Sequence, residues 1–175
     1  REISANPDFA HPEVDARYHD LWARALATGN WTDRALGEVA RVRDTAYFRP
    51  PGYPYFLAAV YRLLGTDYAT PRMVQMGLGI VNILFAWLLG VRWFGRSQAG
   101  VFAFLMAVYW GFIYFEGEVN DPALFVFLAP CLMLALFRWA RTAAVRWAVA
   151  AGLVFGCYAL MRPNILLFGP VAALW

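Results

Sequence analysis

Long apolar runs separated by short polar breaks fill most of the chain after residue 65. Four of these runs come close to the roughly twenty residues that a helix needs to cross a bilayer: 73–94, 99–115, 122–139 and 143–161. A further apolar run begins at residue 164 and reaches the end of the sequence. Pro130 lies inside the third run and should kink its helix. The pattern predicts an all-α fold, a polytopic bundle of transmembrane helices over residues 66–175.

Residues 1–65 show a different pattern, with mixed polar and apolar positions. Apolar side chains recur at helical spacing between Glu13 and Thr28, which predicts an amphipathic helix. A second apolar stretch, Tyr53–Leu64, contains an arginine and is too short to span a membrane. Its tyrosines suit the level of the lipid headgroups. We therefore expect residues 1–65 to form an extracytoplasmic loop with helices lying in the membrane interface.

Composition supports the same class of protein. The chain is 61% hydrophobic and only 15% charged, whereas soluble domains average about 25% charged residues. The net charge of +3 comes from scattered arginines, so nucleic acid is not an expected partner. The sequence starts at Arg1 and stops within an apolar run, so we expect a piece of a longer chain. Membrane lipids, the missing remainder or a partner chain would then surround it.

The most unusual polar segment is the loop 116–121, between the second and third apolar runs. It contains three acids, Glu116, Glu118 and Asp121, within six residues. A charge at the centre of a bilayer costs roughly 2.5–3.5 kcal/mol on insertion scales, so these acids belong at a surface or in a polar cavity. Any one of them fits an ordinary polar loop. Three like charges together are more than loop solubility requires, which favours a functional site.

The arginines predict the orientation in the membrane. Two connections carry positive charges and no acid: one holds Arg92 and Arg96, the other Arg138, Arg141 and Arg146. By the positive-inside rule both face the cytoplasm. The loop 116–121, Arg162 and residues 1–65 then share the opposite face of the membrane.

That face gathers acids and arginines from distant parts of the chain: Asp15, His19, Asp20, Arg49, Glu116, Glu118, Asp121 and Arg162. The planar guanidinium group matches phosphate oxygens, and a carboxylate can accept a proton from an attacking hydroxyl. The set therefore suits an anionic lipid headgroup and a nucleophile that needs activation.

Other interpretations use the same residues. His11, Asp15 and His19 resemble a set of metal ligands, but no second cluster completes the shell, so no metal or other cofactor is expected. A transporter fragment would place its charges near the midplane on broken helices, whereas these acids gather at one surface. A structural membrane subunit without chemistry is the remaining alternative.

Four short motifs, in order along the chain, resemble the GT-C superfamily of glycosyltransferases that use lipid-linked sugars. The similar members are bacterial proteins akin to aminoarabinose transferase and protein O-mannosyltransferases. The motifs are Asp15-Ala16-Arg17-Tyr18 with Leu26–Trp31 downstream, Phe48-Arg49-Pro50-Pro51-Gly52-Tyr53-Pro54, Tyr114–Glu118 with Asp121-Pro122, and Met161-Arg162-Pro163-Asn164.

The resemblance implies an enzyme of the bacterial inner membrane that moves a sugar from a polyprenyl-phosphate donor to an acceptor. Asp15 would be the catalytic base, with Tyr18 in the same motif, and Arg49 and Arg162 would contact the lipid phosphate. Glu118 or Asp121 would position a substrate, with Glu116 beside them in the substrate-binding loop. Some relatives hold a divalent metal there, but nothing in this sequence indicates one.

The chain also departs from the family pattern. Ala16 stands where some relatives have a second acid, which leaves His19, Asp20 or no residue as a helper. The family's first span and several later spans are not in this sequence. We therefore expect the piece alone to be inactive.

Overall fold

The computed structural model describes residues 14–31 and 49–174, and the described part is helical without strands. Its helices, in chain order, are α3 (Val14–Thr28), α6 (Gly52–Leu64), α7 (Ala69–Trp93), α8 (Arg96–Val108), α9 (Trp110–Gly117), α10 (Pro122–Thr142), α11 (Val145–Met161), the 3₁₀ helix η1 (Pro163–Leu167) and α12 (Phe168–Leu174). The predicted all-α class is confirmed.

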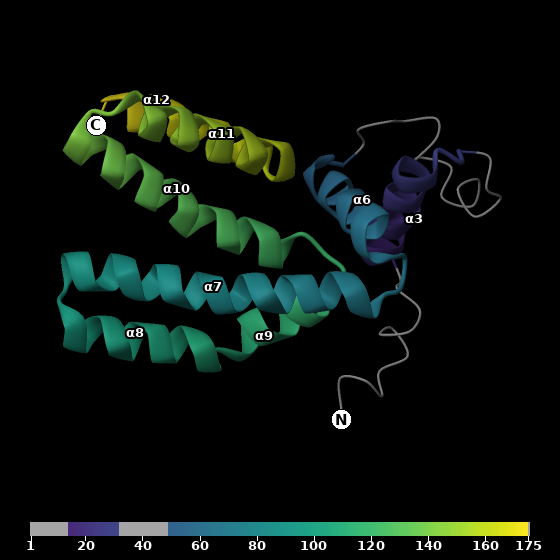
Figure 1. Ribbon diagram of the computed structural model, residues 1–175, viewed down its shortest axis with the longest axis horizontal. Helices are drawn as coiled ribbons and strands as arrows, with labels where there is room; N and C mark the ends of the chain where they lie inside the picture. Colours follow the sequence, from purple (N-terminus) through teal and green to yellow (C-terminus); the bar gives the residue numbers. More distant parts are fainter. Residues whose placement is uncertain (1–13, 32–48, 175) are drawn as a thin grey trace.

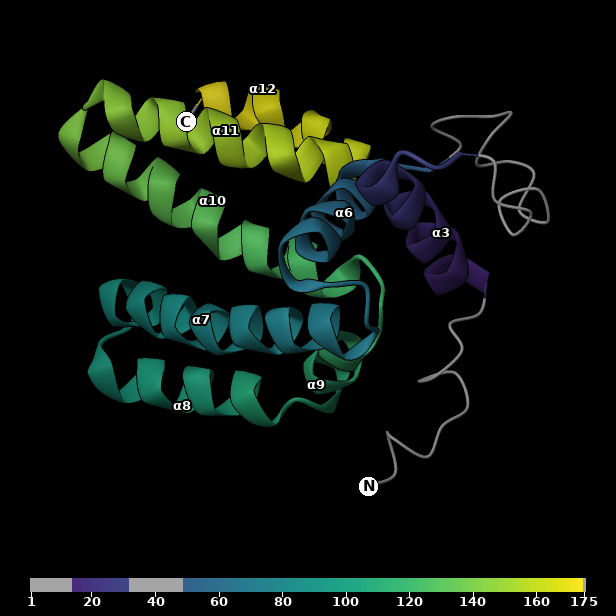
Figure 2. The same cartoon turned by 45° about the vertical axis from the view of Figure 1, so that its right-hand side comes forward.

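The longer helices run side by side and the two N-terminal helices lie across one end of them. Helix α7 packs against α8 on one side and α10 on the other, and α10 packs in turn against α11 (Figure 1). Helices α3 and α6 contact each other near the start of α7 and the end of α11 (Figure 2). The segment between α9 and α10 reaches the same end, so distant parts of the chain meet there.

Two helices, α7 and α10, are long and apolar enough to cross a membrane. Helices α8 and α9 qualify together as a third span that is bent by 48°. Helix α11 is also apolar, and its 17 residues are near the lower limit for a span. The chain is thus a multi-pass membrane protein, as the run lengths predicted.

The expected single helix over 99–115 is broken, which is the main departure from the sequence-based picture. Tyr109 has an extended backbone, with φ −69° and ψ 111°, and separates α8 from α9. The ring of Tyr109 folds across Gly111, where a Cβ atom would come within 2.7 Å of that ring. Glycine therefore permits the break, and a larger residue at position 111 would push the ring away.

The apolar run from residue 164 was expected to be the start of another span. It forms η1 and the short helix α12, and Phe168 packs against the α10–α11 cluster formed by Leu132, Ala135 and Ala151. Pro163 stands at the first position of η1, where a proline's missing N–H costs no hydrogen bond.

One apolar cluster joins the N-terminal helices to the bundle. Its buried members come from α3, α6, the loop before α10, α10 and α11: Ala23, Tyr53, Leu57, Ala58, Tyr61, Val119, Leu124 and Met161. Helix α6 is therefore packed between other elements along one face, while Leu63 and Leu64 at its end stay exposed. The burial of this cluster fixes the position of everything at this end of the molecule.

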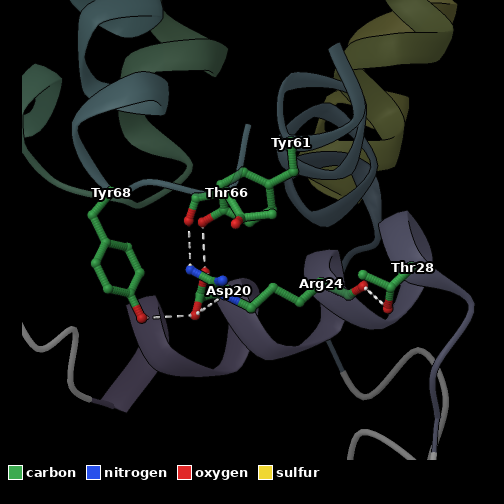
Figure 3. A network of polar contacts seen from close by, with 6 residues as sticks. All are labelled: Asp20, Arg24, Thr28, Tyr61, Thr66 and Tyr68. Carbon is green, nitrogen blue, oxygen red and sulfur yellow. Dashed lines mark hydrogen bonds and ion pairs between the residues drawn. The ribbon is translucent and has the colours of Figure 1, made fainter. Parts of the chain in front are cut away.

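A buried carboxylate also fastens α3 to the chain around α6 (Figure 3). Asp20 is only 3% exposed. Its oxygens accept hydrogen bonds from the Tyr61 hydroxyl at 2.5 Å, the Tyr68 hydroxyl at 3.0 Å and Arg24 Nε at 2.9 Å. Burial and the adjacent Asp20 charge raise the pKa of Tyr61, so its hydroxyl stays a donor. Asp20 therefore attaches α3 to Tyr61 of α6 and to Tyr68, which directly precedes α7.

Candidate functional site

Two arginine–aspartate pairs lie at the end of the bundle where the N-terminal helices sit. Arg49 Nη1 is 2.6 Å from Asp15 Oδ2. Arg162 holds Asp121 through two nitrogens, with Nε 3.1 Å from Oδ2 and Nη2 3.3 Å from Oδ1. The side chains of Arg49, Asp15 and Arg162 remain partly exposed, so both pairs are accessible from outside.

Local backbone geometry places each member of these pairs. Asp15 lies in the first turn of α3, where an acid is favoured by the helix dipole. Asp121 directly precedes α10, which starts with a proline. Arg162 follows α11 in extended conformation, with φ −140° and ψ 92°, because the residue before a proline avoids helix.

A close backbone contact brings the Arg49 segment to the end of α11. A Cβ atom on Gly52 would lie 2.8 Å from the carbonyl carbon of Leu160 and 2.7 Å from the Met161 side chain. Only glycine allows this approach without a shift of the chain. The start of α6 therefore touches the segment that carries Arg162, and the two arginines share one end of the molecule.

The pKa of His19 is affected by charged residues from both pairs. It lies one turn after Asp15 on α3, is 5% exposed, and packs edge-on against Tyr53 with ring centroids 5.1 Å apart. Burial, together with the positive charges of Arg49 and Arg162, lowers the pKa of His19 to about 4, against an opposing effect of the Asp15 charge. Both arginines therefore lie near the same imidazole, which is neutral at physiological pH.

Asp121 is linked to Asp15 by the same electrostatics. Burial raises the pKa of Asp121, Arg162 opposes that effect, and the negative charge of Asp15 raises it again. Asp121 therefore lies close enough to Asp15 for their charges to interact. A carboxyl with a raised pKa next to a second carboxylate is a common feature of functional sites.

The other predicted site residues separate into those near the pairs and those directed elsewhere. Tyr18 belongs to the site, because the Arg49 guanidinium lies 5.8 Å from the centre of its ring. Glu118 instead accepts a hydrogen bond from the Tyr114 hydroxyl at 2.5 Å. Glu116 packs against Gly79 of α7 and lines a cavity inside the bundle.

A buried glutamine supports the loop that carries the acids. Gln75, on α7, is 0% exposed. Its Nε2 donates hydrogen bonds to the carbonyl oxygens of Glu116 at 3.1 Å and Glu118 at 2.6 Å. Its Oε1 accepts a hydrogen bond from the Tyr53 hydroxyl at 2.6 Å. Arg72 adds a bond from Nε to the Gly117 carbonyl at 2.8 Å.

The sequence analysis did not single out Gln75 or Arg72. The signal was present, because buried polar side chains at the start of a membrane span are rare and need partners. The residues His11 and Glu13, which the sequence analysis considered, lie outside the described residues. Within residues 14–31 and 49–174, no group of three or more histidine, cysteine, aspartate or glutamate side chains could hold a metal ion.

Comparison with known families gives one match. Residues 48–175 match the model of the family described as dolichyl-phosphate-mannose-protein mannosyltransferase. The match begins one residue before Arg49 and includes Asp121 and Arg162, whereas Asp15 precedes it. Comparison with curated proteins gave no match, and comparison with solved structures gave none either.

Proposed function

Because the chain belongs to the dolichyl-phosphate-mannose-protein mannosyltransferase family, we propose that it is part of an enzyme that transfers a sugar from a polyprenyl-phosphate donor to an acceptor. The observation that carries the proposal is the meeting of two arginine–aspartate pairs from four distant segments at one end of a membrane bundle. Arginine binds phosphate in bidentate fashion, and a carboxylate can act as a base.

In the proposed reaction the acceptor oxygen attacks the anomeric carbon of the donor sugar. A new carbon–oxygen bond forms there, and the bond from that carbon to the lipid phosphate breaks. The bonding electrons leave with the phosphate, and the acceptor proton goes to the carboxylate of Asp15. Fixed positive charge stabilises the departing phosphate, so Arg49 and Arg162 supply the electrostatic part of catalysis.

The pairing of each arginine with an aspartate suggests how donor binding and activation are linked. The donor phosphate competes with Asp15 for Arg49, since both are anions that fit a guanidinium group. When Arg49 turns to the phosphate, the Asp15 carboxylate loses its ion-pair partner and is free to accept the proton of the acceptor hydroxyl. Asp121 orients Arg162 by its two contacts with the guanidinium group. In the proposed complex Asp121 also contacts the donor or acceptor sugar.

The site is proposed to face the outside of a bacterial inner membrane. The arginine-rich connections after α7 and α10 lie at the opposite end of the bundle from Asp121 and Arg162 (Figure 1). Under the positive-inside rule those connections are cytoplasmic. Residues 49–65, which pack at the site end, are then extracytoplasmic together with the loop 116–121.

The lipid that accompanies the purified protein tests this function. The full-length protein should be extracted in a mild detergent, and its bound lipids identified by mass spectrometry. The proposal expects polyprenyl phosphate or its glycosylated form, reduced at least about tenfold in an Arg49→Ala, Arg162→Ala double variant. Arg146→Ala, at the opposite end of the bundle, is the matched control. Equal amounts of polyprenyl lipid in both variants would contradict the proposed phosphate site.

A further inference from the structure

A cavity of about 250 Å³ lies among α7, α9 and α10. It adjoins the Arg162–Asp121 pair, because the Arg162 guanidinium lies 5.0 Å from the centre of the ring of Phe125, one of the lining residues. Its lining combines aromatic rings with a few polar groups: Gly79, Asn82, Tyr109, Gly111, Phe112, Phe115, Glu116, Pro122, Ala123, Phe125 and Val126. Figure 2 shows α9 against the site end of α7. The volume is slightly below the roughly 300–1,000 Å³ of ligand pockets, so it suits a small head group.

Two acceptor groups in this lining have no partner within the chain. Asn82 is 5% exposed, and its buried Oδ1 makes no hydrogen bond. The carboxylate of Glu116 has no hydrogen bond or ion pair with any residue in the described part of the chain. Leaving a buried acceptor unpaired costs about 1–3 kcal/mol. The buried Asn82 oxygen therefore calls for a donor that the described part of the chain does not provide, and the half-buried Glu116 carboxylate beside it is free to accept one as well.

The backbone around the cavity points to a binding site too. Tyr109, the residue at which the helix breaks, is one of the lining residues. Irregular backbone at membrane depth is tolerated where it lines a cavity or is buried in protein. Glu116 is an ionisable residue at the outer end of the bent candidate span formed by α8 and α9, and such a residue is by default a functional-site hypothesis. Tyr109 at the helix break, Glu116 and the unpaired Asn82 amide therefore all line the same cavity.

The side chains that line the cavity indicate which charge its ligand carries. None of the lining residues is basic, which disfavours an anion. One carboxylate and one amide are too few oxygen ligands for Ca²⁺, which takes six to eight, or for a dedicated Mg²⁺ site. Aromatic faces next to a carboxylate attract organic ammonium groups by cation–π interaction, and here Tyr109, Phe112, Phe115 and Phe125 supply them.

We propose that this cavity binds the ammonium group of an organic ligand, held by Glu116, Asn82 and the surrounding aromatic rings. The ligand donates its N–H groups to the two unpaired acceptors. The ammonium can come from an aminophospholipid headgroup or from a free amine, because both offer the same chemistry. The assignment is independent of sugar transfer, since it uses neither Asp15 nor the arginines.

Two binding measurements on the full-length protein separate the two sources. Ethanolamine is titrated against the detergent-purified protein and followed by saturation-transfer NMR, with ethylene glycol as the uncharged reference. In parallel, the protein is reconstituted in vesicles of phosphatidylethanolamine and phosphatidylglycerol, and retained lipids are weighed by native mass spectrometry. Glu116→Gln keeps the size and removes the charge. Asp67→Asn removes an exposed acid outside the cavity and is the matched control.

The proposal expects Glu116→Gln to weaken ammonium binding at least about tenfold and Asp67→Asn to leave it unchanged. Binding of ethanolamine identifies a free amine as ligand, and retention of phosphatidylethanolamine without ethanolamine binding identifies the lipid. If Glu116→Gln fails to fold, judged by its helical circular dichroism, Asn82→Leu should show a several-fold loss instead. The proposal would be overturned if wild type, Glu116→Gln and Asn82→Leu bound the ammonium ligand equally well. It would also be overturned if the protein retained phosphatidylglycerol as strongly as phosphatidylethanolamine.

Discussion

Arg162 binds both carboxylate oxygens of Asp121 across a sequence separation of 41 residues. The contact links the end of α11 to the start of α10, and it leaves the guanidinium group 5.0 Å from the centre of the Phe125 ring. Such a planar, bidentate and stacked arrangement depends on arginine, because lysine offers a point charge without the fork.

Replacement of Arg162 by lysine should therefore reduce sugar transfer even though the charge is kept. We expect the transfer rate to fall roughly tenfold to a hundredfold. The removal of one fixed hydrogen-bond donor that stabilises negative charge in a transition state has an effect of similar order. The measurement is initial transfer rate with a polyprenyl-phosphate-sugar donor and the full-length protein. Arg146→Lys, at the other end of the bundle, is the control. A variant at position 162 that works as fast as the wild type would remove Arg162 from the site.

Replacement of Gln75 by leucine should destabilise the loop that carries the acids. The change leaves the carbonyl groups of Glu116 and Glu118 and the Tyr53 hydroxyl without their partner. Each buried group left unpaired costs about 1–3 kcal/mol, so a loss of roughly 2–4 kcal/mol is expected. Thermal unfolding in detergent measures it. Gln98→Leu, an exposed glutamine on α8, should change the stability little, and equal effects would contradict the supporting role.

Replacement of Asp20 by asparagine should weaken the attachment of α3. Asparagine keeps the size but removes the charge that pairs with Arg24, and its NH₂ group would face the donors of Tyr61 or Tyr68. Breaking a buried ion pair typically costs 3–5 kcal/mol, and because Arg24 is one-third exposed we expect about 3 kcal/mol. Limited proteolysis after Thr28 should become faster in this variant than in Asp67→Asn. Unchanged proteolysis would assign the attachment to the apolar cluster alone.

The buried imidazole of His19 makes the stability depend on pH. Its pKa falls from 6.5 to about 4 on folding, so the unfolded chain binds more protons between these values. Stability from this group is present above pH 6.5 and is lost as the pH falls toward 4. His19→Gln lacks that titration, so its stability relative to wild type should rise between pH 7 and pH 5. If the difference in unfolding free energy between His19→Gln and wild type is the same at pH 7 and pH 5, this assignment is contradicted.

Much of the fold follows from the length of apolar runs. The positions of α7, α10 and α11 agree with the predicted spans, because a bilayer demands long apolar helices. The break at Tyr109 was not predictable from hydropathy, since every residue around it is apolar. It depends on the packing of one ring over Gly111, a contact that the pattern of residues does not encode.

The residues of the candidate site were easier to predict from the sequence than the contacts that each of them makes. The predicted orientation placed Asp15, Arg49, Asp121 and Arg162 on one face of the membrane, and the resemblance to the GT-C superfamily gave each of them a role. Sequence spacing left Glu118 and Asp121 equivalent, and only the structure pairs Asp121 with Arg162 and Glu118 with Tyr114. A glutamine near the start of a membrane span was a visible signal, but the partners of Gln75 are backbone carbonyls of the distant loop 116–118, which the sequence alone does not reveal.

The most direct test of the proposed chemistry is the Asp15→Asn variant of the full-length protein in a donor-lipid transfer assay. Asparagine keeps the size and polarity of the side chain but cannot accept the acceptor's proton. A general base contributes roughly 10²–10⁴-fold, so the transfer rate should fall at least about a hundredfold while polyprenyl-phosphate binding persists. Asp67→Asn should transfer at the wild-type rate. Near-normal transfer by Asp15→Asn would contradict the assignment of Asp15 as the base.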